Sequence, residues 1–135
     1  MVSKKVLCCM VCLLLCLTGC ADKEASKEKI RDLEFTVVKE EEIPEELKVQ
    51  IEQKQESRFK LTYKTEEYLY IASGYGAQET GGYSICIKEL YLTENAIYLK
   101  TELSGPQKGE NVSKGMSFPY IVVKLERRDE PVVFE

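Results

Sequence analysis

The chain has 135 residues, of which 23 are acidic and 19 basic, with a formal net charge of −4 and neither histidine nor tryptophan. Its length suits one domain rather than two, and its acidic balance argues against nucleic acid binding, which needs a clustered basic face. Without histidine the commonest proton shuttle and metal ligand are missing, so we expect no enzyme activity, no metal and no cofactor.

The first twenty residues have the pattern of a lipoprotein export signal. Two lysines precede an uncharged apolar run over residues 6–17, which is shorter than the roughly 20 residues of a spanning helix. The run ends in a motif that resembles a bacterial lipobox: Leu17, Thr18 and Gly19 for signal peptidase recognition, then Cys20. We predict a signal peptide over 1–19 and lipid attachment at Cys20; the alternative is a plain secretory peptide beside a chance cysteine.

Cleavage would change both the cysteine count and the charge. Four of the six cysteines would leave with the signal peptide and Cys20 would be acylated, so Cys86 would remain as the single thiol, without an intramolecular disulfide. Loss of two lysines would lower the net charge from −4 to −6. We therefore expect a lipid-anchored protein on the extracytoplasmic face of the cell membrane, bound to the bilayer through its acyl group alone.

Residues 20–32 are charged and small, and this composition predicts a flexible tether of about 20 Å before a single domain over 33–135. Alternating apolar residues predict a first strand over 33–39. Pro44 suits the first turn of a helix over 44–57, in which Ile43, Leu47 and Ile51 would form one apolar stripe lying on a sheet.

The rest of the chain has the alternation of successive strands. We predict strands over 59–64, 68–73, 83–92, 96–103, 119–126 and 132–134. A change of apolar parity before Leu90 indicates a bulge, and 93–95 is a predicted hairpin in which Asn95 would accept a positive φ. The expected fold is mainly β (α+β): an antiparallel sheet or a small β-sandwich with one N-terminal helix.

A glycine-rich segment, 73–85, stands between two apolar strands and is the strongest candidate for a binding loop. Glycines there would allow close backbone approach, and tyrosines flank them. Cys86 lies on the more polar parity of its strand with no histidine to activate it, so we interpret it as a bystander. The predicted partner-binding residues are Tyr75, Gly76, Gln78, Thr80, Gly81, Gly82, Tyr83, Phe118, Pro119 and Tyr120.

Three motifs in this order, GYGAQETGGYSI, LYLTENAIYLKTELSGPQKGENVSKG and FPYIVVKL, resemble the PrcB C-terminal domain family. The resemblance covers about residues 61–125. The family takes its name from a lipoprotein that associates with and stabilises a secreted protease complex. The resemblance therefore implies a non-catalytic protein-binding or protease-complex accessory module, whose partner would be an exported protease or another envelope protein.

Two other functions stay open. Chagasin-type cysteine protease inhibitors present a TTGY-like, a glycine-rich and an RPW-like loop, and Thr80–Tyr83, the loop 104–115 and Phe118–Tyr120 follow the same order. Gly82 is an insertion in the first motif, and Phe118 and Tyr120 replace the arginine and tryptophan of the last. The other alternative is a structural envelope lipoprotein without a specific ligand.

Overall fold

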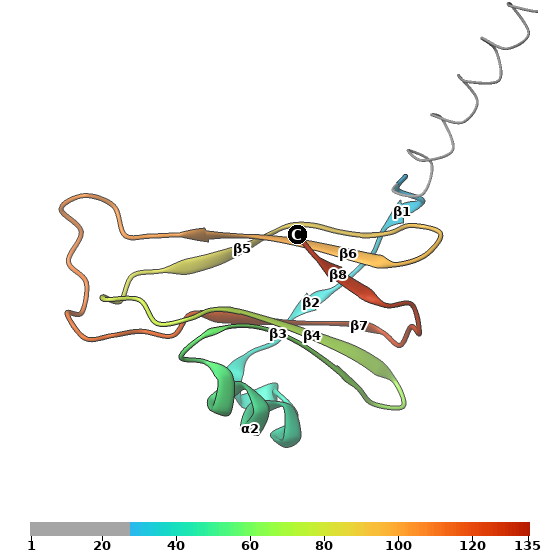
Figure 1. Ribbon diagram of the computed structural model, residues 1–135, viewed down its shortest axis with the longest axis horizontal. Coiled ribbons are helices and arrows are strands. Elements are labelled where there is room, and N and C mark those ends of the chain that lie inside the picture. The colour runs from blue at the N-terminus through green and yellow to red at the C-terminus, as the bar shows by residue number, and fades with distance from the viewer. Residues whose placement is uncertain (1–27) are drawn as a thin grey trace, which may run out of the picture.

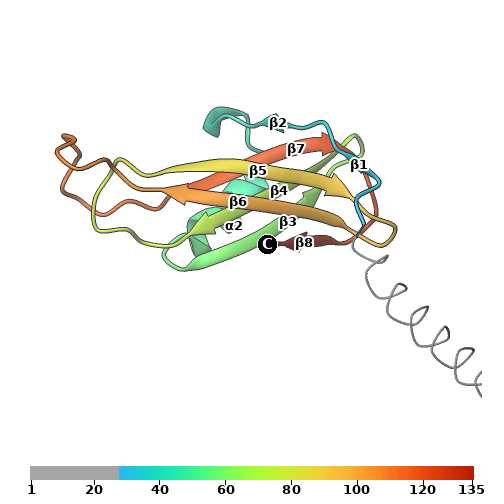
Figure 2. The ribbon, with the colours of Figure 1, turned by 90° about the horizontal axis from the view of Figure 1, so that it is seen from above.

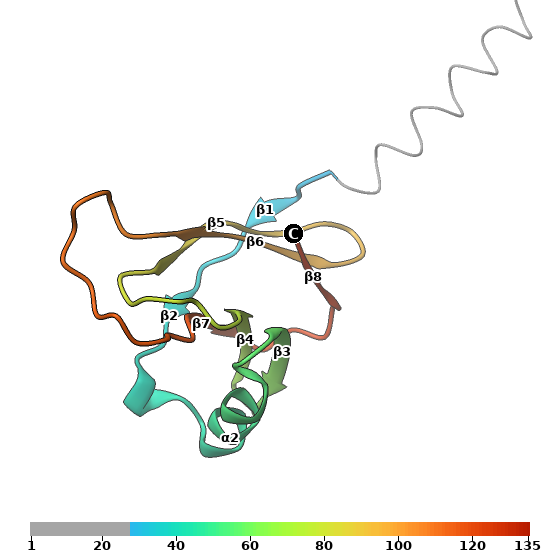
Figure 3. The same cartoon turned by 60° about the vertical axis from the view of Figure 1, so that its left-hand side comes forward.

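The structure is a computed structural model that describes residues 28–135. The predicted signal peptide, the acylation of Cys20 and residues 20–27 of the predicted tether lie outside these residues. The described part folds into two packed sheets with a helix on the outer face of one of them (Figures 1 and 3).

Sheet A has the strand order β1-β5-β6-β8, and sheet B has the order β2-β7-β4-β3. The strands of sheet A are β1 (Arg31–Asp32), β5 (Ser84–Leu92), β6 (Ile97–Ser104) and β8 (Val132–Phe134). The strands of sheet B are β2 (Thr36–Val37), β7 (Tyr120–Glu126), β4 (Tyr68–Tyr75) and β3 (Arg58–Lys64). Neighbouring strands are antiparallel except β6 and β8, which are parallel. The predicted mainly β sandwich with one N-terminal helix is confirmed.

Strand β4 is central because both of its faces are covered. Leu69 and Ile71 face sheet A, where they pack against Leu90 and Leu99 of β5 and β6. The alternate residues face away from sheet A, and Ala72 among them packs against the helix. This double burial explains why the sequence of β4 is apolar at successive positions instead of alternating.

The helix α2 (Glu45–Lys54) follows a short 3-10 helix, η1 (Glu40–Glu42), and covers the outer face of sheet B. Its predicted stripe is confirmed, since Ile43, Leu47 and Ile51 are all buried. The N-cap is Pro44, with no side-chain hydrogen bond to the first turn. Glu45 and Glu46 occupy that turn, where negative charge complements the helix dipole. Packing on the sheet, rather than capping, therefore holds this helix in place.

The N-terminal segment differs from the prediction of one strand over 33–39. The chain pairs first with sheet A through Arg31 and Asp32, then crosses at Leu33–Phe35 and pairs with sheet B through Thr36 and Val37. The Ile30 amide also donates to the Leu92 carbonyl at 2.7 Å, so the end of the predicted tether is attached to sheet A. Alternation alone does not distinguish one long strand from two short strands in opposite sheets.

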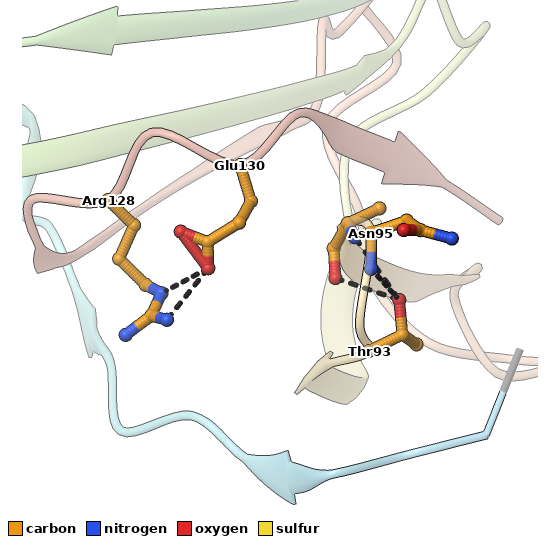
Figure 4. A network of polar contacts seen from close by, with 5 residues as sticks. Thr93, Asn95, Arg128 and Glu130 are labelled. Atoms are coloured by element: carbon orange, nitrogen blue, oxygen red, sulfur yellow. Dashed lines mark hydrogen bonds and ion pairs between the residues drawn. The ribbon is translucent and has the colours of Figure 1, made fainter. Parts of the chain in front are cut away.

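The hairpin between β5 and β6 is confirmed, but its predicted backbone is wrong. No non-glycine residue within 28–135 has a positive φ, so Asn95 does not adopt the left-handed conformation. Instead the buried Thr93 hydroxyl accepts hydrogen bonds from the amides of Asn95 and Ala96 at 3.3 and 3.2 Å (Figure 4). The predicted bulge is confirmed by the register shift between Ile87 and Glu89.

An ion pair in the β7–β8 connection makes stability depend on pH. Partial burial of the Glu130 carboxyl opposes its ionisation, but the Arg128 guanidinium, bound through two nitrogens at 2.7 and 2.9 Å, lowers its pKa below the usual value (Figure 4). A lowered pKa in the folded state stabilises the fold above the unfolded pKa, and that contribution disappears as the pH falls through the folded value.

We therefore expect Arg128→Gln to lower the free energy of unfolding at neutral pH by less than about 1 kcal/mol, as for other partly exposed pairs. The difference from the unaltered protein should shrink as the pH falls from about 7 towards about 2 and passes the lowered pKa of Glu130, because a protonated carboxyl no longer pairs with Arg128. Urea denaturation of both proteins across this pH range measures it. A difference that stays constant down to pH 3 would contradict this assignment.

Candidate partner-binding site

Two loops lie together at one end of the sandwich. Residues 76–83 connect β4 to β5, and residues 105–119 connect β6 to β7. The opposite end holds the β5–β6 hairpin and β1, which pairs with Tyr91 and Leu92 at the far end of β5 (Figures 1 and 2). Since a strand rises about 3.3 Å per residue, the length of β5 separates the loops from β1 by about 25–30 Å.

Hydrogen bonds join the two loops into one unit, which we call the double loop (residues 76–83 and 105–119). The amides and carbonyls of Gln78 and Ser117 bond reciprocally at 2.8 and 3.0 Å. The Gly81 amide donates to the Ser113 carbonyl at 2.9 Å, and the Ser117 hydroxyl donates to the Thr80 carbonyl at 2.7 Å. The backbone of each loop is therefore held by the other.

Close packing supports the same contact. Gly82 has a φ of +86°, and a Cβ atom at this position would collide with the Val112 side chain and lie 3.1 Å from Pro106. The Tyr83 ring lies against Gly105 at the start of the longer loop. Gly82 thus combines a left-handed backbone with a tight approach of the two loops, and only glycine meets both demands without strain.

The first two predicted binding residues lie at the base of the double loop and not on its surface. The Tyr75 hydroxyl forms a short hydrogen bond with the Thr101 hydroxyl of sheet A, and the Arg58 guanidinium lies over the Tyr75 ring at 4.9 Å. Gly76, with a φ of +79°, is buried next to the backbone of Ser57 and Arg58. Both residues position the loop.

Phe118, Pro119 and Tyr120 lie on the sheet B side of the double loop. They line a surface groove of about 330 Å³ together with Val38 and Ile43. Tyr120 packs against the hydrophobic core between sheet B and α2, and its ring centroid lies 6.4 Å from that of Phe59. Burial raises the pKa of the Tyr120 hydroxyl, and the nearby carboxylates of Glu40 and Glu52 raise it further.

The structure therefore divides the predicted set into three places. It brings Gln78, Thr80, Gly81, Gly82 and Tyr83 together against the longer loop, leaves Tyr75 and Gly76 below them, and places Phe118–Tyr120 beside the groove.

Sequence reasoning missed the residues that face the glycine segment from the longer loop, above all Ser113 and Ser117. It also missed Met116, which is 65% exposed next to them. Nothing in the local pattern of a polar loop identifies which serines will pair with a distant segment. An exposed methionine inside that polar loop was the one available signal, because flexible apolar side chains suit recognition surfaces.

The reactive and metal-binding side chains of the described part are few and dispersed. Within 28–135 no three acidic or cysteine side chains are grouped as metal ligands, and the Cys86 thiol is free and exposed on its strand. No helix of this part has the length and apolar character required to cross a bilayer. The double loop presents a fixed backbone surrounded by hydroxyl, amide and methionine side chains and by the exposed charged residues Glu79, Lys108, Glu110 and Lys114.

Comparison with protein families gives a match to part of the chain. The family model described as PrcB C-terminal matches residues 69–126, which include nearly all of β4, the double loop, β5, β6 and β7. No curated protein and no solved structure matches the chain. The predicted resemblance is confirmed, and the stretch that forms the candidate site, residues 69–126, is a match to the PrcB C-terminal family.

Proposed function

We propose that this protein is a lipid-anchored accessory module that binds a partner protein, an exported protease or its complex, through the double loop. The observation on which the proposal depends is that two loops, hydrogen-bonded into one unit, lie at the end opposite to β1. The match to the PrcB C-terminal family supports the protease complex as the partner class. In this proposal the protein contributes binding and no catalytic step.

Three features support such a role. An acyl group on Cys20 would place the β1 end towards the membrane, so the double loop would face outward. Loops whose backbone is already fixed lose little conformational entropy on binding, which favours affinity. An exposed methionine of the longer loop, Met116, offers an apolar contact that adapts to the partner surface.

A pair of glycine variants tests the double loop. Gly82 and Gly109 share a φ of +86°, but a Cβ atom at Gly109 meets nothing within 4 Å, whereas one at Gly82 collides with Val112. Both substitutions to alanine incur a left-handed strain of about 1–2 kcal/mol, and only Gly82→Ala separates the loops. We expect Gly82→Ala to reduce partner recovery at least about tenfold, and Gly109→Ala to leave most of it.

Two measurements test this prediction. Crosslinking on intact cells followed by mass spectrometry quantifies the recovered partner, and hydrogen exchange reports whether the amides of Gln78, Gly81 and Ser117 remain protected. Gly82→Ala should expose these amides while the amides of β4 stay protected. If the loop amides exchange freely and the same partner is still recovered in full, the double loop is not the binding surface.

Inhibition of a cysteine protease is the second candidate function. It is supported by the position of Thr80–Tyr83, 104–115 and Phe118–Tyr120 at the same end of a two-sheet sandwich. The prediction is tight inhibition of papain-like peptidases by the purified protein, lost in Gly82→Ala. If a panel of secreted and papain-like peptidases keeps full activity, only the accessory role remains.

A further inference from the structure

A cleft of about 230 Å³ opens on one side of the sandwich, between the edge strand β3 of sheet B and strands β6 and β8 of sheet A. Figures 2 and 3 show β3 and β8 on this same side. The cleft is separate from the exposed tip of the double loop. Its lining is mixed, with Arg58 and Lys60 from β3, Leu99 and Thr101 from β6, and Phe134 from β8. One acidic residue, Glu135, also lines the cleft, so the two cations of β3 outnumber it.

The alternation of β3 directs its cations into this cleft. Phe59, Leu61 and Tyr63 pack in the hydrophobic core between sheet B and α2. The alternate residues of β3 therefore point to the other face of the sheet: Arg58, Lys60, Thr62 and Lys64. Lys64 has a carboxylate partner, Asp129, at 3.5 Å. Arg58 and Lys60 are in none of the ion pairs formed within 28–135 and lie instead over the rings of Tyr75 and Phe134, at 4.9 and 5.7 Å.

The strand beside these cations has a free edge. Strand β8 pairs with Ile97–Leu99 of β6, and the Glu135 amide donates to the Leu99 carbonyl at 2.8 Å. Residues 100–104 of β6 have no strand partner on that side in the described part of the chain. Unpaired amides and carbonyls of such an edge accept an additional strand.

We propose that an extended acidic segment of a partner protein binds in this cleft as an added strand on residues 100–104 of β6. Side chains on one face of a strand recur about every 6.6 Å, the same interval that separates Arg58 from Lys60 on β3. Two carboxylates at alternate positions of the added strand therefore meet two cations that have no carboxylate partner. Main-chain hydrogen bonds to β6 supply affinity, and the charge pairs select acidic sequences.

Binding of a defined peptide to the purified full chain tests this site. The probe is a fluorescein-labelled peptide of about nine residues in which glutamate alternates with valine, compared with a peptide of the same length in which lysine replaces glutamate. We expect fluorescence anisotropy to detect the acidic peptide alone, with an affinity that falls as salt is added. Equal binding of both peptides would overturn the proposal.

A charge-matched pair of variants locates the contact. Lys60→Glu reverses a cation inside the cleft. Lys39→Glu makes the same change at an exposed position between β2 and η1, at the edge of sheet B opposite to β3 and outside the cleft. Lys60→Glu should weaken binding of the acidic peptide at least about tenfold, and Lys39→Glu less than about threefold. Similar losses of affinity in the two variants would show that binding depends only on the net charge of the protein, which would overturn the proposed site. Thermal unfolding checks that both variants fold. If Lys60→Glu does not fold, Lys60→Gln replaces it, with a smaller expected loss of affinity.

The strand itself is tested separately. N-methylation of alternate peptide amides on the edge facing β6 should abolish binding, whereas methylation on the opposite edge should leave it unchanged. Full binding of both methylated peptides, or displacement of the probe by free glutamate at the concentration at which the unlabelled peptide displaces it, would indicate a simple anion site and overturn strand addition. Gly82→Ala should bind the probe normally, because the cleft does not depend on the double loop.

Discussion

Gly74→Ala is expected to lower the free energy of unfolding by about 2–3 kcal/mol, because overfilling a packed core forces side chains or backbone to move. Gly74 lies in β4 directly below the Phe59 ring, and a Cβ atom there would collide with three of the ring carbons. Phe59 is 7% exposed and belongs to the core beneath α2, so it has little room to shift. The melting temperature should fall by about 10–20 °C.

A double-mutant cycle with Phe59→Ala identifies the collision as the cause. Phe59→Ala alone removes a buried aromatic side chain and should cost about 3–5 kcal/mol. In the double variant the new methyl group has space, so the combined loss should be smaller than the sum of the two single losses by at least about 1 kcal/mol. Strictly additive losses would show that the ring does not restrict position 74.

Leu47→Ala should destabilise the protein by about 3–4 kcal/mol, the second large effect that we expect. Leu47 is fully buried, at 0% exposure, in the middle of the stripe by which α2 packs on sheet B. Removing its side chain leaves a cavity between helix and sheet that neither element can close. Urea denaturation measures the loss.

Val49→Ala is the matched control on the same helix. Val49 is 43% exposed and lies outside the stripe, and alanine forms helix better than valine. We expect a change within about 0.5 kcal/mol of zero. Equal losses for Val49→Ala and Leu47→Ala would contradict the one-sided attachment of α2.

Much of the fold can be predicted from local sequence patterns, because the buried positions of a helix or strand recur at a fixed spacing. The spacing of Ile43, Leu47 and Ile51 predicts both the helix and the face by which it packs. The change of parity before Leu90 predicts the bulge in β5. In each case the covered face is determined by neighbouring residues on the same element, so one sequence is sufficient to recognise it.

Pairing between segments that are far apart in the chain has no such local pattern. The crossing of the chain from β1 to β2 places residues 31–32 and 36–37 in different sheets, a choice made by the edges of β5 and β7 that are available to them. The hairpin is another example, since Thr93, rather than a left-handed Asn95, satisfies its amides.

The candidate site shows the same division. Glycine content singles out the loop 76–83, and the tight approach at Gly82 justifies that choice. The contacts from Ser113 and Ser117, the inward position of Tyr75 and the cleft below Arg58 depend on how the two sheets are stacked. Composition could not reveal them, because the residues involved are up to several tens of positions apart in the chain.

Site-specific photo-crosslinking on intact cells tests the central claim that the outward double loop binds a protein partner. A photoreactive residue replaces Met116 in the longer loop or, as control, Val49, which is 43% exposed on α2. We predict one discrete crosslinked protein, an exported protease or a component of its complex, from position 116 only, and its loss when Gly82→Ala is added. The same product from position 49, or no product from position 116, would contradict the account.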